Sequence, residues 1–235
     1  MFSALANAGI NIQMITTSEI KISCLVQRSE GTQALRAVHQ AFELHKKPTD
    51  ANTWLIGQME HTKMSPSEVV ERLRSTNLEQ LTLLDISLLD HQARVTLSGV
   101  ADNPGLAEQI FQAVAEAGAV VDMIVQSCDG HHGQTAISFT VPSEQREACL
   151  GVLSQGKFGV RKVTSDGDIS KLSVSGIGLR SHTSVAIALF KALADEGINV
   201  LMTNTSELRV NVVVAGKDSK RALEALKKTF QSALI

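Results

Sequence analysis

The sequence GINIQMITTSEIK, residues 9–21, returns near the other end of the chain as GINVLMTNTSELR, residues 197–209. The two copies align without a gap from Phe2/Phe190 to Phe42/Phe230. A repeat of this length indicates that one supersecondary unit is built twice, so it decides the fold before any single element is considered.

A more distant third copy lies between these two. Its sequence, FQAVAEAGAVVDMIVQS at residues 111–127, aligns with residues 190–206 and keeps the phenylalanine, the glycine, the methionine and the final serine. The 235 residues therefore contain three related units, each of roughly 65 to 80 residues. The first is incomplete, because Met1-Phe2 corresponds to Leu189-Phe190 inside a predicted helix. We expect Met1 to be an internal methionine of a longer protein or a fragment boundary.

Composition and charge exclude several classes of function. A net charge of −2 gives no reason to expect a nucleic acid or an anionic membrane as partner. Cys24, Cys128 and Cys149 are too few and too scattered for a disulfide framework or a zinc site, which favours a reducing cytoplasm. No apolar run approaches the roughly 20 residues that span a bilayer, and the N-terminus lacks the pattern of a signal peptide.

Hydrophobic spacing in the last unit predicts the element order β-α-β-β-α. Strands are expected at 172–176, 198–202 and 208–214, a first helix ends at Gly197, and a second helix ends near Phe230. This order is typical of the split βαβ, ferredoxin-like fold. Residues 232–235 are too few to establish its closing strand.

The middle unit follows the same order. Strands are predicted at 93–99, 120–127, 135–141 and 160–164, and helices at 104–117 and 143–153, with Pro104 in a first helical turn. Residues 81–89 offer a further strand in front of this unit. Residues 43–78 match no repeat and are interpreted as a linker, in which Pro66 begins one helix and Trp54 makes a docking contact.

Two sets of motifs resemble the regulatory region of aspartate kinase, which is built from paired ACT domains. The middle unit contains DNPG at 102–105 and VDMIVQ at 121–126, similar to the family's D-x-P-G and V-D-M-I-x-Q motifs. The last unit contains GIGLRSHTSV at 176–185, and both outer units carry a version of the family's T-S-E block. The last unit departs from the family pattern at Ser184, Thr203-Asn204 and Asn211.

The order of these motifs is similar to that of aspartate kinases with four ACT domains, as in cyanobacteria. The resemblance implies an α+β fold of tandem ferredoxin-like ACT domains (βαββαβ), the first of them incomplete. It places the C-terminal part of an ACT domain at 1–45, a linker with one helix at 46–78, an ACT domain of the D-x-P-G type at 79–165 and one of the T-S-E type at 166–235. On this hypothesis the amino-acid kinase domain lies upstream.

The D-x-P-G motif suits an amino-acid ligand. It joins a strand to a helix, and the unpaired N–H groups at a helix N-terminus attract a carboxylate. The Asp102 carboxylate is then in a position to hold the ligand's amino group. The alternative is that Asp102 caps the helix.

Further effector-binding residues follow from the resemblance, which places the pocket between ACT domains of the two types. Asn11 and Asn199 are expected at its edge, with the alternative that they are turn residues. Hydroxyl groups in the T-S-E hairpins either reach the ligand or satisfy the turn, and Gln126 either binds the effector or is solvated. Met123 and Met202 are predicted to be core residues. The full set of candidates is Asp102, Asn103, Pro104, Gly105, Gln126, Asn199, Val200, Thr205, Ser206, Asn11 and Ser18.

Rival functions find little support in the sequence. The glycines at 176 and 178 imitate a dinucleotide fingerprint, but its third glycine is absent and no acidic residue follows at the required distance. His131-His132 at a hairpin tip makes a weak metal site. RNA binding by a ferredoxin-like sheet needs exposed aromatic residues and a basic face, and the chain has no tyrosine and one tryptophan.

The resemblance therefore implies a regulatory region that binds lysine, threonine or both and controls an attached kinase by feedback. It implies no cofactor in this chain, whereas the parent kinase domain uses ATP and Mg²⁺ to phosphorylate aspartate. We expect a cytoplasmic homo-oligomer that pairs through its sheets. The alternative is a stand-alone ACT regulatory subunit that acts on a kinase in trans.

The incomplete first unit carries its own expectation. In a ferredoxin-like sheet the first strand is central, so its loss would leave residues 10–26 without a partner at an aggregation-prone edge. We expect residues 2–42 to be loosely folded and residues 80–235 to be compact.

Overall fold

The computed structural model describes residues 1–18, 21–46, 82–128, 134–177, 179 and 183–231. Its strands form one eight-stranded sheet in the order β2-β1-β4-β5-β3-β6-β8-β7, in which every neighbouring pair is antiparallel. The strands are β1 (Met14–Thr17), β2 (Ile22–Leu25), β3 (Thr82–Ala101), β4 (Ile124–Cys128), β5 (Gln134–Pro142), β6 (Lys162–Ile177), β7 (Met202–Thr205) and β8 (Arg209–Ala215). The helices are α1 (Phe2–Asn7), α2 (Gly31–Ala41), α4 (Leu106–Glu116), α5 (Arg146–Leu153), α6 (Thr183–Asp195) and α7 (Ser219–Phe230).

Two long strands, β3 and β6, run through both halves of the sheet. They contain 20 and 16 residues and pair with each other along most of their length. The first half of β3 pairs with the second half of β6, from Thr82↔Ile177 to Leu89↔Lys171. The second half of β3 pairs with the first half of β6, as far as Ser98↔Lys162. Strand β3 therefore supplies the closing strand of the last unit and the first strand of the middle unit. Strand β6 supplies the closing strand of the middle unit and the first strand of the last unit.

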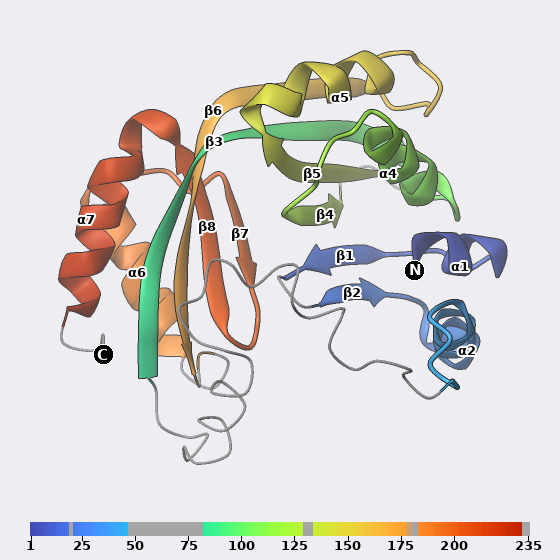
Figure 1. Cartoon of the computed structure of the whole chain (residues 1–235), viewed down its shortest axis with the longest axis horizontal. Helices are drawn as coiled ribbons and strands as arrows, with labels where there is room; N and C mark the ends of the chain where they lie inside the picture. Colours follow the sequence, from blue (N-terminus) through green and yellow to red (C-terminus); the bar gives the residue numbers. More distant parts are fainter. Residues whose placement is uncertain (19–20, 47–81, 129–133, 178, 180–182, 232–235) are drawn as a thin grey trace.

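A bulge in β3 marks the point where the sheet changes direction. The pairing register shifts on either side of Gln92, and His91 has a positive φ of 56°. Across from the bulge, Ser170 Oγ donates a hydrogen bond of 2.6 Å to Asp90 Oδ1. Bulges bend a strand and increase its twist, and Figure 1 shows that the two halves of the sheet run in different directions.

Each half of the sheet is a complete ferredoxin-like unit. The middle unit has the strand order β4-β5-β3-β6 and carries α4 and α5, and the last unit has the order β3-β6-β8-β7 and carries α6 and α7 (Figure 1). The predicted α+β fold is confirmed. The strand expected in front of the middle unit is present from Thr82, where it forms the first part of β3. It pairs with residues 171–177 of β6 and thereby supplies the closing strand of the last unit. Leu83 and Ile86 are buried in the core of that unit, with Leu172 and Leu189.

The first unit is held by the middle unit. Strand β1 pairs with β2 and, at Thr16↔Val125, with β4. Ile15 is buried in the core of the middle unit, and the ring of Phe2 stacks on that of Phe111 with 5.5 Å between centroids. The expectation that residues 10–26 lack a partner is therefore wrong, because the edge of β4 supplies one (Figure 1).

Several element boundaries differ from those predicted, and two of these differences affect the site. Helix α4 begins at Leu106 rather than Pro104, because Gly105 before it has a left-handed φ of 88° that is incompatible with a helical turn. Strand β7 begins at Met202, so Asn199 and Val200 lie in the loop before it. The predicted linker helix, Trp54, the histidine pair and the closing residues 232–235 lie outside the described residues. Among the described helices, none has the length and apolar composition of a membrane span.

The shared strand predicts a long-range effect of a mutation in β3. Ile86→Ala removes a buried side chain from the last unit and should lower the free energy of unfolding by about 2 to 5 kcal/mol. Hydrogen exchange should accelerate in α6, α7 and β8, although these elements are far away in sequence. Ser87→Ala, at the exposed neighbouring position, is the matched control and should change stability by less than about 0.5 kcal/mol. Faster exchange confined to α4 and α5 would contradict the strand assignment.

Candidate functional site

The D-x-P-G loop joins the end of β3 to the start of α4. Asn103 N donates to Ala101 O at 2.9 Å, and Gly105 occupies the N-cap position of α4, where no side chain forms a capping hydrogen bond. The alternative that Asp102 caps the helix is thus wrong. Because helical N–H groups of the first turn have no partner within a helix, this end of α4 can accept an anion.

Asp102 instead contacts the first unit. Its Oδ1 accepts a hydrogen bond of 2.9 Å from Asn11 Nδ2. A Cβ at Gly105 would lie 3.6 Å from the Cβ of Ala6, so α1 packs closely against the same loop. The loop of the middle unit and the start of β1 therefore form one interface.

Gln126 is the second polar link across this interface. Its side chain is 7% exposed, its Nε2 donates to Ile12 O at 3.3 Å, and its Oε1 has no hydrogen-bond partner among the described residues. A buried amide oxygen without a partner is unfavourable. It would be satisfied by a ligand that brings a donor such as an ammonium group.

These predicted residues line a common cavity of about 20 Å³. Asn11, Asp102, Asn103, Gly105 and Gln126 contribute to it. A volume of roughly 10 to 15 Å³ holds one water molecule, so an amino acid can enter only if the two units separate. The groups on its wall include a carboxylate and an amide oxygen that suit an ammonium group, and a helix N-terminus that suits a carboxylate.

The other candidates lie elsewhere. Asn199 is exposed and Val200 packs against the core of the last unit, so Asn11 and not Asn199 faces Asp102. Pro104 is exposed and does not line the cavity. Thr205 and Ser206 belong to a larger cavity between the first and last units, which Ser18 also lines.

The serines of the two T-S-E hairpins hold their turns. Ser206 Oγ accepts from Arg209 N at 3.1 Å, and Ser18 Oγ donates to Lys21 O at 3.3 Å. These contacts correspond to the alternative in which the hydroxyls satisfy the turn.

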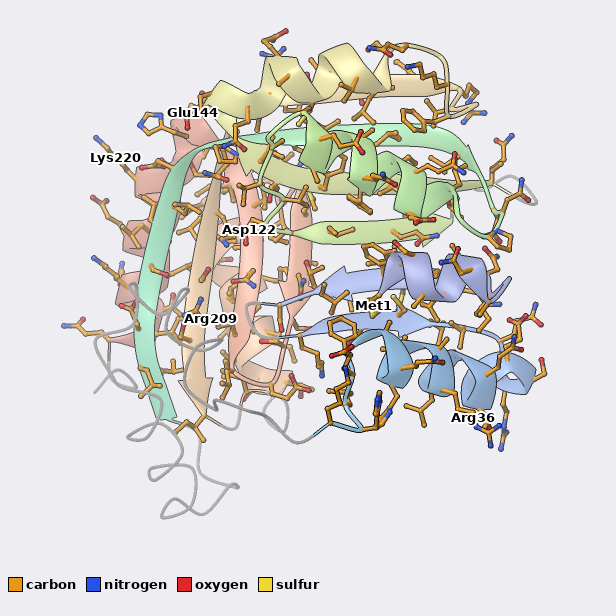
Figure 2. The ribbon with its side chains drawn as sticks, turned by 45° about the vertical axis from the view of Figure 1, so that its right-hand side comes forward. Met1, Arg36, Asp122, Glu144, Arg209 and Lys220 are labelled. Carbon is orange, nitrogen blue, oxygen red and sulfur yellow. The ribbon has the colours of Figure 1, made fainter. Side chains whose placement is uncertain are left out.

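The start of β4 contacts the last unit. Asp122 forms an ion pair with Lys171, which is 9% exposed, and Figure 2 shows Asp122 near the junction of the two halves of the sheet. Met123 and Met202, which occupy the same repeat position, are buried together with Ile169 and Val213. The prediction that both methionines are core residues is confirmed.

Sequence reasoning missed two groups at the first interface. Thr17 Oγ1 donates to Asp122 O at 3.2 Å and accepts from Ile124 N at 2.9 Å, which fastens β1 to β4. Ile12 contributes its backbone carbonyl to Gln126. The role of Thr17 could have been inferred from the sequence, because a hydroxyl side chain at the end of a strand often bonds to nearby backbone groups. The role of Ile12 could not, because every residue carries a backbone carbonyl and no residue pattern distinguishes this one.

Burial alters the chemistry of two cysteines. It raises the pKa of Cys24 from 9.0 to about 11, and it also raises the pKa of Cys149. Cys24 packs against the core of the middle unit. Within the described residues, no group of three or more histidine, cysteine, aspartate or glutamate side chains could hold a metal ion.

Known proteins share this arrangement. A sequence model of the ACT domain matches residues 1–42, 95–156 and 172–230, which is more than half of the chain. The aspartokinase of Helicobacter pylori (strain ATCC 700392 / 26695) is 33% identical over 205 residues, which are 86% of this chain and 49% of the relative. The chain thus spans about half the length of that relative.

Two crystal structures are similar in fold as well. Aspartate kinase from Synechocystis aligns with a TM-score of 0.78 and 30% identity over 99% of this chain and 36% of its own. The regulatory subunit of aspartate kinase from Thermus flavus aligns with a TM-score of 0.59 and 34% identity over 63% of this chain and 99% of its own. The chain therefore belongs to the ACT domain family and, within it, to the regulatory ACT region of aspartate kinases.

The raised pKa of Cys24 predicts low thiol reactivity as long as the first unit stays docked. At pH 8 roughly one thiol in a thousand would be a thiolate, against about a tenth for a cysteine with the ordinary pKa of 9.0. Alkylation of Cys24 by iodoacetamide, followed by site-resolved mass spectrometry, should therefore be at least about a hundredfold slower in the native chain than in urea. Equal rates in both conditions would show that the first unit does not pack against the middle unit.

Proposed function

We propose that this chain is the amino-acid-sensing region of an aspartate kinase and that it binds lysine, threonine or both between the first and middle units. The supporting observation is the convergence of Asp102, the N-terminus of α4 and the unpartnered Oε1 of Gln126 on one interface. This combination of acceptors and an anion-binding helix end matches the two charged groups of a free amino acid.

The ligand would replace the direct contact between the units. Its ammonium group takes the place of Asn11 Nδ2 at the Asp102 carboxylate and donates to Gln126 Oε1. Its carboxylate approaches the N–H groups at the start of α4. Since the cavity is only about 20 Å³, binding moves Asn11 and Ile12 away from the D-x-P-G loop.

This movement provides the regulation. A ligand shifts a conformational equilibrium only if it binds the two states with different affinities, and the separated arrangement alone has room for it. The shift then lowers the rate at which a kinase domain, using ATP and Mg²⁺, phosphorylates the aspartate side chain in the cytoplasm. Strands β2 and β7, which end the sheet, are the edges through which a homo-oligomer would extend it.

A second candidate is a regulatory subunit that acts on its kinase in trans. The observation that favours it is the match to the regulatory subunit from Thermus flavus, of which this chain covers 99%. Adding the purified chain to a separately expressed kinase domain distinguishes the two possibilities. Restored inhibition by lysine or threonine supports the trans-acting subunit, and inhibition only in a continuous polypeptide supports the attached region.

Calorimetric titration of the chain with lysine and threonine, separately and together, tests the proposed site. Saturable binding is expected for at least one of them. Asp102→Ala should weaken it by at least about tenfold, because an ammonium group loses its charged partner.

The matched control is Asp195→Ala, which removes an exposed carboxylate from the end of α6. It should leave the affinity unchanged. Absence of binding in the folded chain, or binding that is equally strong in Asp102→Ala, would contradict the proposed site.

A further inference from the structure

The three units meet at the residues that lead into β4. Thr17 belongs to the first unit, Asp122 to the middle unit, and Asn204 to the last unit. Lys171 comes from the second half of β6, which is also part of the last unit. These four residues form a three-unit junction, whose contacts run from the last unit through the first and the middle units and back to the last.

Asp122 is held from two sides at this junction. Its backbone carbonyl accepts a hydrogen bond of 3.2 Å from Thr17 Oγ1, and its carboxylate forms an ion pair with Lys171 Nζ. Lys171 lies on the part of β6 that pairs with β8, within the last unit. A movement of the last unit that displaces the Asp122 carboxylate therefore acts on the hydrogen bond to Thr17.

Asn204 supplies a second contact between the last unit and Thr17. Its side chain is 5% exposed, and its Nδ2 donates to the backbone carbonyl of Thr17. The equivalent residue of the first unit is Thr16, so this amide is specific to the last unit. Thr17 is thus bound to the last unit by its carbonyl group and to the middle unit by its hydroxyl group.

The bend in the sheet determines whether these contacts can form together. It is centred on the bulge in β3, where the register shifts on either side of Gln92 and His91 has a positive φ of 56°. Across the bend, Arg94 NH1 donates to Leu201 O at 2.9 Å, and Arg94 Nε donates to Asp166 Oδ2 at 2.9 Å. Bulges set the local bend and twist of a strand, so a change of angle here would move the last unit relative to the start of β4.

The junction also lies beside buried apolar side chains. Met123 follows Asp122 and is buried in one cluster with Met202, and the Lys171 side chain is 11% exposed. Hydrogen bonds and ion pairs that are shielded from water are stronger than exposed ones, and a shielded charge that loses its partner is costly. A change in one unit can therefore be transmitted to another through these contacts.

We propose that the three-unit junction couples docking of the first unit to the bend between the middle and last units. At the observed angle, Asp122 and Asn204 hold Thr17 from two sides, and β1 stays paired with β4. When the bend opens, both contacts with the last unit break together, and the first unit is held less firmly. The coupling requires no ligand at the Asp102 interface.

Alkylation of Cys24 tests this coupling with a change made outside the first unit. Cys24 packs against the core of the middle unit, so its reaction with iodoacetamide reports how often the first unit undocks. Lys171→Met keeps an aliphatic side chain but removes the charge that holds Asp122, and it should accelerate the alkylation by at least about tenfold. Asn204→Leu should also accelerate it, because the carbonyl of Thr17 loses a buried donor.

The matched control is Lys191→Met, which removes an exposed lysine that pairs with Asp195 inside α6. It should leave the alkylation rate unchanged. The double variant Lys171→Met with Asn204→Leu should show less than the product of the two single effects, because both contacts belong to one junction.

Hydrogen exchange in α7 separates undocking of the first unit from unfolding of the last unit. It should match that of the native chain in every variant. Three results would overturn the proposal: an unchanged alkylation rate of Cys24 in Lys171→Met, single effects that multiply fully in the double variant, or faster exchange in α7.

Discussion

The antiparallel pairing of β3 with β6 is the constraint on which the rest of the structure depends. Because each strand passes from one unit into the other, the middle and last units cannot fold as independent domains. The bulge at Asp90 to Gln92 bends the sheet, and this bend brings the start of β4 against the start of β7. The buried contact of Met123 with Met202 and the Asp122–Lys171 ion pair both follow from it.

The first unit is attached in a different way, by an edge rather than by shared strands. It is held to the middle unit by one backbone pairing at Thr16↔Val125 and by the side-chain hydrogen bonds of Thr17, Asn11 and Gln126. The packing of Ile15 and Phe2 against the core of the middle unit adds apolar contacts. Such a junction has few hydrogen bonds, and a ligand shifts it only to the extent that it binds the docked and the separated arrangement with different affinities. The short strand β1 lies between the Asp102 interface, near its start, and the larger cavity, near its end.

The first and last units are copies of one repeat, yet equivalent residues in the two copies have different surroundings. Equivalent segments supply Asn11 and Asn199, yet only Asn11 faces a D-x-P-G loop, because β4 pairs with β1. Equivalent hairpins supply Ser18 and Ser206, which hold their own turns in the same manner. The last unit departs from the family pattern at Asn204 and Asn211, whose side chains are buried and whose Oδ1 atoms have no hydrogen-bond partner among the described residues.

The sequence by itself determined the three units, the ferredoxin-like order of elements, the resemblance to ACT domains and the buried methionines. Repeat alignment and hydrophobic periodicity suffice for these features, because they depend on local spacing and on which face of an element is apolar. Only the tertiary structure decided that residues 82–89 close the last unit, that β4 supports β1, and that Asn11 rather than Asn199 meets Asp102. Strand partners are chosen by backbone groups, which every residue carries alike, and by packing between segments far apart in sequence. No local pattern records those choices.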